Sequence, residues 1–216
     1  MAVQVHVVSD LICPWCYIGK RRMERAIAEL GEPVELVWHP FQLNPDMPRD
    51  GMERAQYRTL KFGSIERSHQ LDAQVSEAAA GEGLAFRYDL QKRTPNTFDG
   101  HRVVALALKH GRQDAVVEAL FQAYFAQGRD VGDHATLVEI AEAAGLDGAE
   151  VAAMLATDAL APEVAGNDTA AREAGVSGVP TFILGNRGIS GAHDPATLVR
   201  FLKLAAASAD EEAVLQ

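Results

Sequence analysis

Cys13-Pro14-Trp15-Cys16 holds both cysteines of this 216-residue chain, and the residues on either side indicate its structural setting. Before it, valines at positions 3, 5 and 7 alternate with polar residues, which predicts a strand over residues 3–8. After it, apolar residues recur at helical spacing and predict a helix over residues 14–30, ended by Gly31. The two cysteines therefore lie where a strand passes into a helix.

This position favours ionisation of Cys13. In the first turn of a helix, unpaired backbone amides and the positive end of the helix dipole stabilise a thiolate. Pro14 suits the first helical position, because its missing N–H would have no partner there. Cys16 follows one turn later, within reach of the Cys13 sulfur. We therefore expect Cys13 to attack a disulfide and Cys16 to resolve the mixed disulfide that forms.

A second motif places Pro180 directly before a predicted strand, in Gly178-Val179-Pro180-Thr181-Phe182. An X–Pro bond is the usual place for a cis peptide. In a thioredoxin-type site such a proline faces the dithiol, and the preceding residue, here Val179, pairs through its backbone with the substrate. A proline at the edge of a strand, without such a role, is the structural alternative.

The order of predicted elements indicates an α/β fold with a large insertion. Strand patterns cover residues 3–8 and 34–38, and they return at residues 180–184 and 189–191 around a turn at 186–188. Because the two β portions must meet in one sheet, the residues between them form an insertion. Residues from about 50 to 174 look almost wholly helical, and Asn96 or Thr97 could cap one of these helices.

The expected helical stretches of the insertion cover residues 52–80, 98–110 with 115–126, 135–144, and 148–174 with a break at 161–162. Asp194 is the expected N-cap of a last helix over residues 196–207, with Pro195 at its first position. The acidic tail, residues 208–216, is expected to fray.

Composition excludes several classes of function. The chain has 30 acidic and 20 basic residues and a formal net charge of −10, which argues against nucleic acid because phosphate binding needs clustered cations. No apolar run reaches the ~18 residues of a membrane span. The N-terminal residues lack the basic and apolar regions of a secretory signal, so we expect a cytoplasmic protein. A metal site is not expected, because the seven histidines are scattered and two further ligands would be needed.

Four stretches together resemble the landmarks of the DsbA family, and within it the FrnE-like proteins. They are Ser9-Asp10-Leu11-Ile12-Cys13-Pro14-Trp15-Cys16-Tyr17-Ile18-Gly19, Trp38-His39-Pro40-Phe41-Gln42-Leu43-Asn44-Pro45, Asn96-Thr97-Phe98-Asp99-Gly100-His101-Arg102 and Gly175-Val176-Ser177-Gly178-Val179-Pro180-Thr181-Phe182. The resemblance implies a thioredoxin-like fold interrupted by a large all-helical insertion domain. Residues 1–48 and 175–216 would form the thioredoxin-like domain, and residues 49–174 the insertion.

The resemblance also implies thiol–disulfide oxidoreductase activity, with Cys13 as nucleophile, Cys16 as resolving cysteine and Val179-Pro180 as the cis-proline loop. Pro14 and Trp15 would contact the substrate together with Val179. Asn44, Asn96 and Thr97 would line the cleft between the domains, although turn formation and helix capping explain them equally well. The implied substrates are disulfides of proteins or small thiols. No bound cofactor is expected, glutathione is a candidate co-substrate, and monomer and homodimer both stay open.

Two relatives with different chemistry supply the main alternative. Kappa-class glutathione transferases and 2-hydroxychromene-2-carboxylate isomerases carry a serine where Cys13 stands and use it to activate bound glutathione. This chain keeps both cysteines, and Gly191-Ala192-His193-Asp194 does not reproduce their glutathione-binding turn. A glutathione-dependent transferase or isomerase is therefore the second hypothesis, and a non-catalytic binding module the third.

The residues between the cysteines bear on the direction of the reaction. Pro14-Trp15 lacks the histidine of the strongly oxidising members of the family. An uncharged Trp15 cannot donate as an imidazolium would, so we expect a potential between ~−120 and ~−270 mV. At such a potential in a reducing cytosol, the protein would rest as the dithiol and act as a reductase or isomerase.

Overall fold

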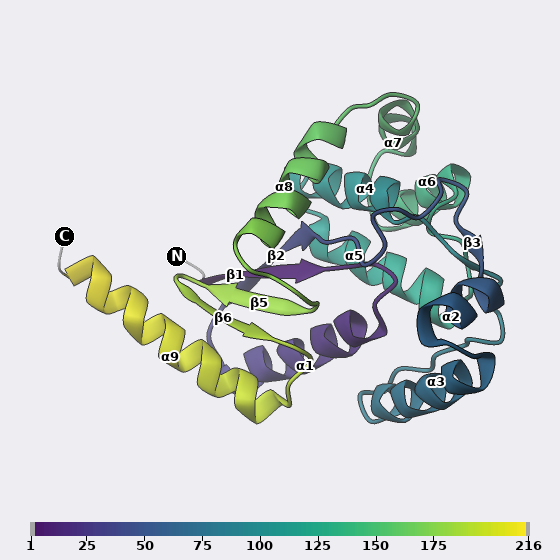
Figure 1. Ribbon diagram of the computed structural model, residues 1–216. Coiled ribbons are helices and arrows are strands. Elements are labelled where there is room, and N and C mark those ends of the chain that lie inside the picture. Colours follow the sequence, from purple (N-terminus) through teal and green to yellow (C-terminus); the bar gives the residue numbers. More distant parts are fainter. Residues whose placement is uncertain (1–2, 215–216) are drawn as a thin grey trace.

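The computed structural model describes residues 3–214, and the side chains of residues 3–204. Its main sheet has the strand order β2-β1-β5-β6 (Figure 1). Strand β1 (Val3–Ser9) is parallel to β2 (Val34–Pro40) and antiparallel to β5 (Thr181–Leu184), which pairs with β6 (Arg187–Ser190). The two β portions that lie far apart in the sequence therefore share one sheet, as the predicted α/β fold requires.

Helices cover both faces of this sheet. Helix α1 (Pro14–Leu30) joins β1 to β2 and packs against α9 (Pro195–Val214) on one face, while α8 (Ala161–Glu173) lies against β2 on the other (Figure 1). Gly31 ends α1 with φ of 74°, a left-handed conformation that glycine adopts without a Cβ clash. No helix within residues 3–214 combines the length and apolar character needed to cross a membrane.

The insertion is helical apart from one short strand pair. Its elements are β3 (Met52–Glu53), α2 (Arg54–Phe62), α3 (Ile65–Ala80), β4 (Arg93–Thr94), α4 (Phe98–Lys109), α5 (Gln113–Phe121), the π-helical turn η1 (Gln122–Ala126), α6 (His134–Ala143), α7 (Gly148–Leu155) and α8. The expected helix over residues 52–80 is wrong in two places, because β3 pairs with β4 and Gly63, with φ of 88°, separates α2 from α3.

Three further boundaries differ from the sequence predictions. The break before α8 covers residues 156–160, and Ala161 and Pro162 open the helix instead of interrupting it. The turn between β5 and β6 falls at Gly185-Asn186, because Gly185 supplies a φ of 58°. Helix α9 continues through Val214, beyond the expected end at residue 207; the fraying of the tail stays a prediction, and residues 215–216 lie outside the described range.

The insertion is fixed to the edge of the sheet by the side chain of Gln113. Its Oε1 accepts a hydrogen bond from Trp38 N at 2.8 Å, and its Nε2 donates to Trp38 O at 2.9 Å. The amide thus satisfies backbone groups that a further strand would otherwise pair with. Next to it, the Trp38 indole donates to Asp114 Oδ1 at 3.0 Å.

One hydrophobic core runs from the sheet into the insertion and includes both cysteines. Tyr17 of α1 stacks on Phe121 of α5, with ring centroids 5.0 Å apart. The Tyr17 hydroxyl donates to Glu118 Oε1 at 2.8 Å, and Lys20, which is 2% exposed, forms ion pairs with Asp114 and Glu118 at 3.2 Å. These contacts hold α1 against the insertion.

Helix α8 contacts both the strand β2 of the sheet and the helix α4 of the insertion. The domain limits at residues 48 and 175 stay a prediction.

Candidate active site

Cys13 is the N-cap residue of α1, and Pro14 occupies the first helical position, as the sequence indicates. The backbone of Cys13 is extended, with φ of −85° and ψ of 112°, and no side chain caps the helix. Cys13 N donates to Asp10 O at 3.1 Å, and Cys16 N donates to Cys13 O at 3.0 Å. The chain therefore holds the Cys13 sulfur at the amide end of α1, where anions are stabilised.

Cys16 lies one turn further along α1 and is fully buried. Burial raises the pKa of the Cys16 thiol well above its usual value, and the hydrogen bond and charge of Cys13 raise it further. Cys13 is 5% exposed and lines a cavity, whereas Cys16 does not line it. Both thiols are reduced in this structure. The two sulfurs thus differ in their access to the cavity, and Cys16 is the one that burial keeps protonated.

The segment before β5 closes over Cys13. The Val179–Pro180 peptide bond is cis, and the Cys13 thiol donates to the Val179 carbonyl oxygen, with sulfur and oxygen 3.6 Å apart. Gly19 of α1 makes this approach possible, since a Cβ there would lie 2.9 Å from Pro180 Cγ. Within the segment itself, the Thr181 hydroxyl donates to Gly178 O at 2.8 Å, and this hydrogen bond closes the turn around Val179 and Pro180.

The loop that leads into α1 is held by the buried carboxylate of Asp10. Its Oδ2 accepts a hydrogen bond from Leu43 N at 2.8 Å, and its Oδ1 lies 3.3 Å from Nε2 of the buried His101. Asp10 thereby ties together the Cys13 loop, the segment after β2 and helix α4 of the insertion. A buried carboxylate requires such partners, and removing them would leave it uncompensated.

A cavity of about 370 Å³ lies beside Cys13. It is bounded by Pro14, Trp15 and Val179 of the thioredoxin-like part and by side chains of α2, α3 and η1. Trp15 is 40% exposed. Asn44 lies next to this cavity, where its Oδ1 accepts hydrogen bonds from the Tyr57 hydroxyl at 3.1 Å and from Lys61 Nζ at 3.2 Å.

The cationic side of this cavity was not predicted from the sequence. Arg54, Arg58 and Lys61 all come from α2 and line it. Their spacing of four and then three residues places them on one helix face. That pattern was the available signal, but it points to a site only when the face is known to lie beside Cys13.

Asn96 and Thr97 are placed elsewhere. Asn96 Oδ1 accepts a hydrogen bond from Phe98 N at 2.9 Å, and its Nδ2 donates to Met47 O at 2.7 Å. Asn96 thus caps α4 and lines a separate pocket of about 270 Å³, whereas Thr97 is buried and its side chain forms no capping bond. Neither residue lines the cavity beside Cys13.

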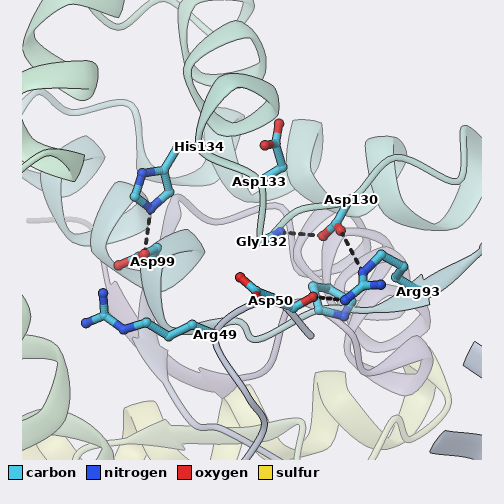
Figure 2. Close-up of a pocket in the computed structure, with 9 residues that line it drawn as sticks. Arg49, Asp50, Arg93, Asp99, Asp130, Gly132, Asp133 and His134 are labelled. Atoms are coloured by element: carbon cyan, nitrogen blue, oxygen red, sulfur yellow. Dashed lines mark hydrogen bonds and ion pairs between the residues drawn. The ribbon is translucent and has the colours of Figure 1, made fainter. Parts of the chain in front are cut away.

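A further pocket, of about 680 Å³, is lined mainly by charged residues and includes neither cysteine (Figure 2). Part of its charge is paired within the pocket: His134 Nε2 lies 2.7 Å from Asp99 Oδ2, and Arg93 contacts Asp130 and the Asp50 carbonyl (Figure 2). Across the described residues, no group of three or more His, Cys, Asp or Glu side chains could hold a metal ion.

The model of the DSBA-like thioredoxin domain matches residues 4–203, and the chain belongs to that family. The Bacillus subtilis (strain 168) protein YwbO is 30% identical over 198 residues, which cover 89% of this chain and 92% of YwbO. The crystal structure of a probable DsbA oxidoreductase from Streptomyces coelicolor superposes with a TM-score of 0.86 and 38% identity, covering 95% of this chain and 90% of that one.

A more distant structure has the same fold. The cytosolic disulfide reductase DsbM from Pseudomonas aeruginosa, solved with GSH, gives a TM-score of 0.66 at 18% identity, covering 94% of this chain and 98% of that one. At this identity the likeness shows the fold alone. The α/β thioredoxin-like fold with a helical insertion is therefore confirmed both by the family match and by the superposed structures.

Proposed function

We propose that this protein is a thiol–disulfide oxidoreductase in which Cys13 is the nucleophile and Cys16 the resolving cysteine. The arrangement that carries the proposal is the Cys13 sulfur at the N-terminus of α1, 3.6 Å from the Val179 carbonyl oxygen, with Cys16 buried one turn behind it. The family match and the probable DsbA oxidoreductase from Streptomyces coelicolor support this class of reaction.

The proposed exchange has two displacement steps. The Cys13 thiolate attacks one sulfur of a substrate disulfide, so a Cys13–substrate disulfide forms and the other substrate sulfur leaves as a thiolate that takes up a proton. Cys16 then loses its proton and attacks the Cys13 sulfur, which releases the second substrate thiol. Two electrons pass from the protein to the substrate, and a thiol reductant returns them by the reverse steps.

The buried Cys16 gives this order of attack a physical basis. Its raised pKa keeps it a thiol while Cys13 reacts, so the mixed disulfide forms at Cys13 first. The Val179 carbonyl oxygen lies against the reacting sulfur, Pro180 follows it through the cis bond, and in the proposal the Val179 backbone pairs with the substrate once Cys13 has ionised. Pro14 and Trp15 contact the substrate at the cavity, and Asn44 orients Tyr57 and Lys61 there.

Glutathione is the proposed co-substrate, supported by the cytosolic reductase DsbM, which was solved with GSH. The same comparison supports a cytoplasmic location for this protein. The alternative, a glutathione-dependent transferase or isomerase, differs in its products, because it binds glutathione and never forms a Cys13–Cys16 disulfide. The two hypotheses can therefore be separated by mass.

The test uses the reduced full chain, mixed with glutathione disulfide, quenched with acid and read by intact mass. We expect the wild type to lose the mass of two hydrogen atoms as Cys13–Cys16 closes, with the two electrons passing to glutathione disulfide. Cys16→Ser should stop at a glutathione adduct on Cys13, and Cys13→Ser should remain unmodified over the same time. An adduct on wild-type Cys13 that never resolves would favour the transferase hypothesis, and no reaction at either cysteine would contradict both oxidoreductase steps.

A further inference from the structure

The cavity beside Cys13 carries a net positive charge in an acidic protein. Its lining includes the cations Arg54, Arg58 and Lys61 and a single carboxylate, Asp72. The chain as a whole has a formal charge of −10. A cationic cavity in such a chain is the opposite of what overall composition predicts, and it attracts anions toward the Cys13 sulfur.

Asp72 neutralises only part of this charge. Arg54 Nη2 donates to Asp72 Oδ2 at 2.8 Å, and Arg58 Nη2 donates to Asp72 Oδ1. The Nε atoms are also occupied, that of Arg54 by Gln91 and that of Arg58 by the Ser68 hydroxyl. Nη1 of each arginine has no hydrogen-bond acceptor among the residues that the structure describes.

Both guanidinium groups are held rigidly and away from bulk water. Arg54 and Arg58 are 11% and 16% exposed in their side chains, and Asp72 is 12% exposed. Arg54 lies 4.9 Å from the centroid of the Tyr88 ring, and Arg58 lies 4.3 Å from that of Phe62. Cations fixed in this way lose little entropy on binding an anion, and a partly dry site strengthens the attraction.

Much of the remaining lining is apolar or aromatic. It includes Val75, Tyr88, Tyr124 and Phe125, together with Leu71 and Ile12, and Cys13 lines the same cavity. Tyr57 lies within electrostatic range of both Arg58 and Cys13. Burial raises the pKa of Tyr57, the charge of Arg58 lowers it, and the charge of Cys13 raises it. A volume of about 370 Å³ is in the range of small-molecule sites.

We infer that this cavity selects small disulfides that carry a carboxylate, with the carboxylate on Nη1 of Arg54 and Arg58. This inference rests on the proposed function and names its substrate class. The apolar body of the substrate lies against Tyr88 and Tyr124, and its disulfide lies at Cys13. A planar carboxylate suits the paired N–H groups of a guanidinium, and Lys61 at the mouth adds attraction at longer range. In one turnover the reduced protein converts such a disulfide to two thiols and becomes the Cys13–Cys16 disulfide.

Two chromogenic probes separate charge from general thiol reactivity. The dicarboxylate 5,5′-dithiobis(2-nitrobenzoate) and the neutral 4,4′-dithiodipyridine both release a coloured thiol when the reduced full chain attacks them. Each variant is compared with the wild type for each probe, so the intrinsic reactivities of the probes cancel. We expect Arg58→Gln to slow the dicarboxylate about tenfold, equivalent to about 1.4 kcal/mol, and the neutral probe less than about twofold.

Further variants show whether a change in rate comes from the lost charge or from misfolding of a single variant. Lys61→Gln removes an exposed cation and should slow only the dicarboxylate, by about threefold, with the difference shrinking in high salt. Asp72→Asn should speed the dicarboxylate, the opposite direction to Arg58→Gln. Arg67→Gln is the matched control, because Arg67 is exposed on α3 and does not line the cavity, so neither rate should change.

The outcomes distinguish this inference from the proposed function. Normal reaction with both probes, equally affected or unaffected by Arg58→Gln and Lys61→Gln, would overturn the anion site and leave the oxidoreductase intact. Failure of wild-type Cys13 to react with either probe, or failure of Cys13–Cys16 to close afterwards, would instead overturn the proposed function. A selective loss of the dicarboxylate rate in both variants supports the inference.

Discussion

The thiol of Cys13 donates to the carbonyl oxygen of Val179, although the two residues lie on opposite sides of the helical insertion in the sequence. The carbonyl can only accept, so this hydrogen bond exists only while Cys13 carries its proton. Ionisation of Cys13 or its conversion to a disulfide releases the oxygen. In the proposed reaction, the change that activates the nucleophile therefore also frees a backbone acceptor for the substrate.

The difference between the two thiols predicts selective alkylation. A raised pKa means that, at any pH below it, Cys16 holds less thiolate than an ordinary cysteine, and burial blocks access as well. Iodoacetamide at pH 7 should therefore label the reduced protein once, at Cys13, with Cys16 labelled only after denaturation. Peptide mass mapping reads the result, and first labelling at Cys16 would contradict the assigned order of attack.

Gly19 predicts a link between helix packing and activity. A methyl group at Gly19 would lie 2.9 Å from Pro180 Cγ and 3.4 Å from Phe182 Cζ, so the loop over Cys13 must shift. Gly19→Ala should lower the free energy of unfolding by about 1–3 kcal/mol and slow disulfide exchange. Urea unfolding and the rate with glutathione disulfide measure the two effects.

The matched control for this substitution is Gly166→Ala in α8. Nothing lies within 4 Å of a Cβ at Gly166, so the change only improves helix propensity. It should stabilise the protein by about 0.5–1 kcal/mol and leave the exchange rate unchanged. Equal exchange rates in Gly19→Ala and wild type would show that the approach of α1 to Pro180 does not matter for the reaction.

Trp15 predicts a pH-dependent change of redox potential. In Trp15→His, a protonated imidazole beside Cys13 would stabilise the thiolate and thus the reduced form. We expect the potential to become more oxidising by about 30 mV at pH 6, equivalent to a tenfold change in the equilibrium constant. The imidazole loses its proton near pH 6.5, so the shift should shrink by pH 8. Trp15→Phe controls for the loss of the indole, and a pH-independent shift would exclude this electrostatic cause.

The buried Asp10 predicts a large stability effect. Asp10→Ala leaves Leu43 N without its acceptor and His101 without its carboxylate partner. An unpaired buried group such as the His101 imidazole costs about 1–3 kcal/mol, so the midpoint of urea unfolding should fall clearly. The exposed Asp46→Ala is the control and should change stability little. A similar midpoint in both variants would mean that Asp10 does not hold the Cys13 loop.

Much of the fold follows from local signals in the sequence. Pro14 opens α1, Gly31 ends it, and Asp194 caps α9, with its Oδ1 accepting from Thr197 N at 3.0 Å. Each of these signals acts within one helical turn, so the start or end of the helix can be predicted without knowledge of the fold. The early and late strand patterns likewise fixed which strands had to meet in one sheet.

What the sequence did not predict depends on contacts between distant segments. The pairing of Met52 with Thr94 is too short to leave an alternation pattern and needs a partner strand elsewhere in the chain. The cationic cavity depends on the docking of α2 beside Cys13, which no local pattern encodes. For Asn96, the sequence left two alternatives, a position in the cleft between the domains and a helix cap. Only the structure shows that its side chain accepts a hydrogen bond from Phe98 N.

The most direct test of dithiol–disulfide exchange is the redox equilibrium of Cys13 and Cys16 in graded glutathione buffers, read by thiol alkylation and intact mass. We expect one two-electron transition between dithiol and disulfide, with a midpoint between ~−120 and ~−270 mV. A pair that stays reduced across all buffers, or a Cys13–glutathione adduct that never closes to Cys13–Cys16, would contradict it.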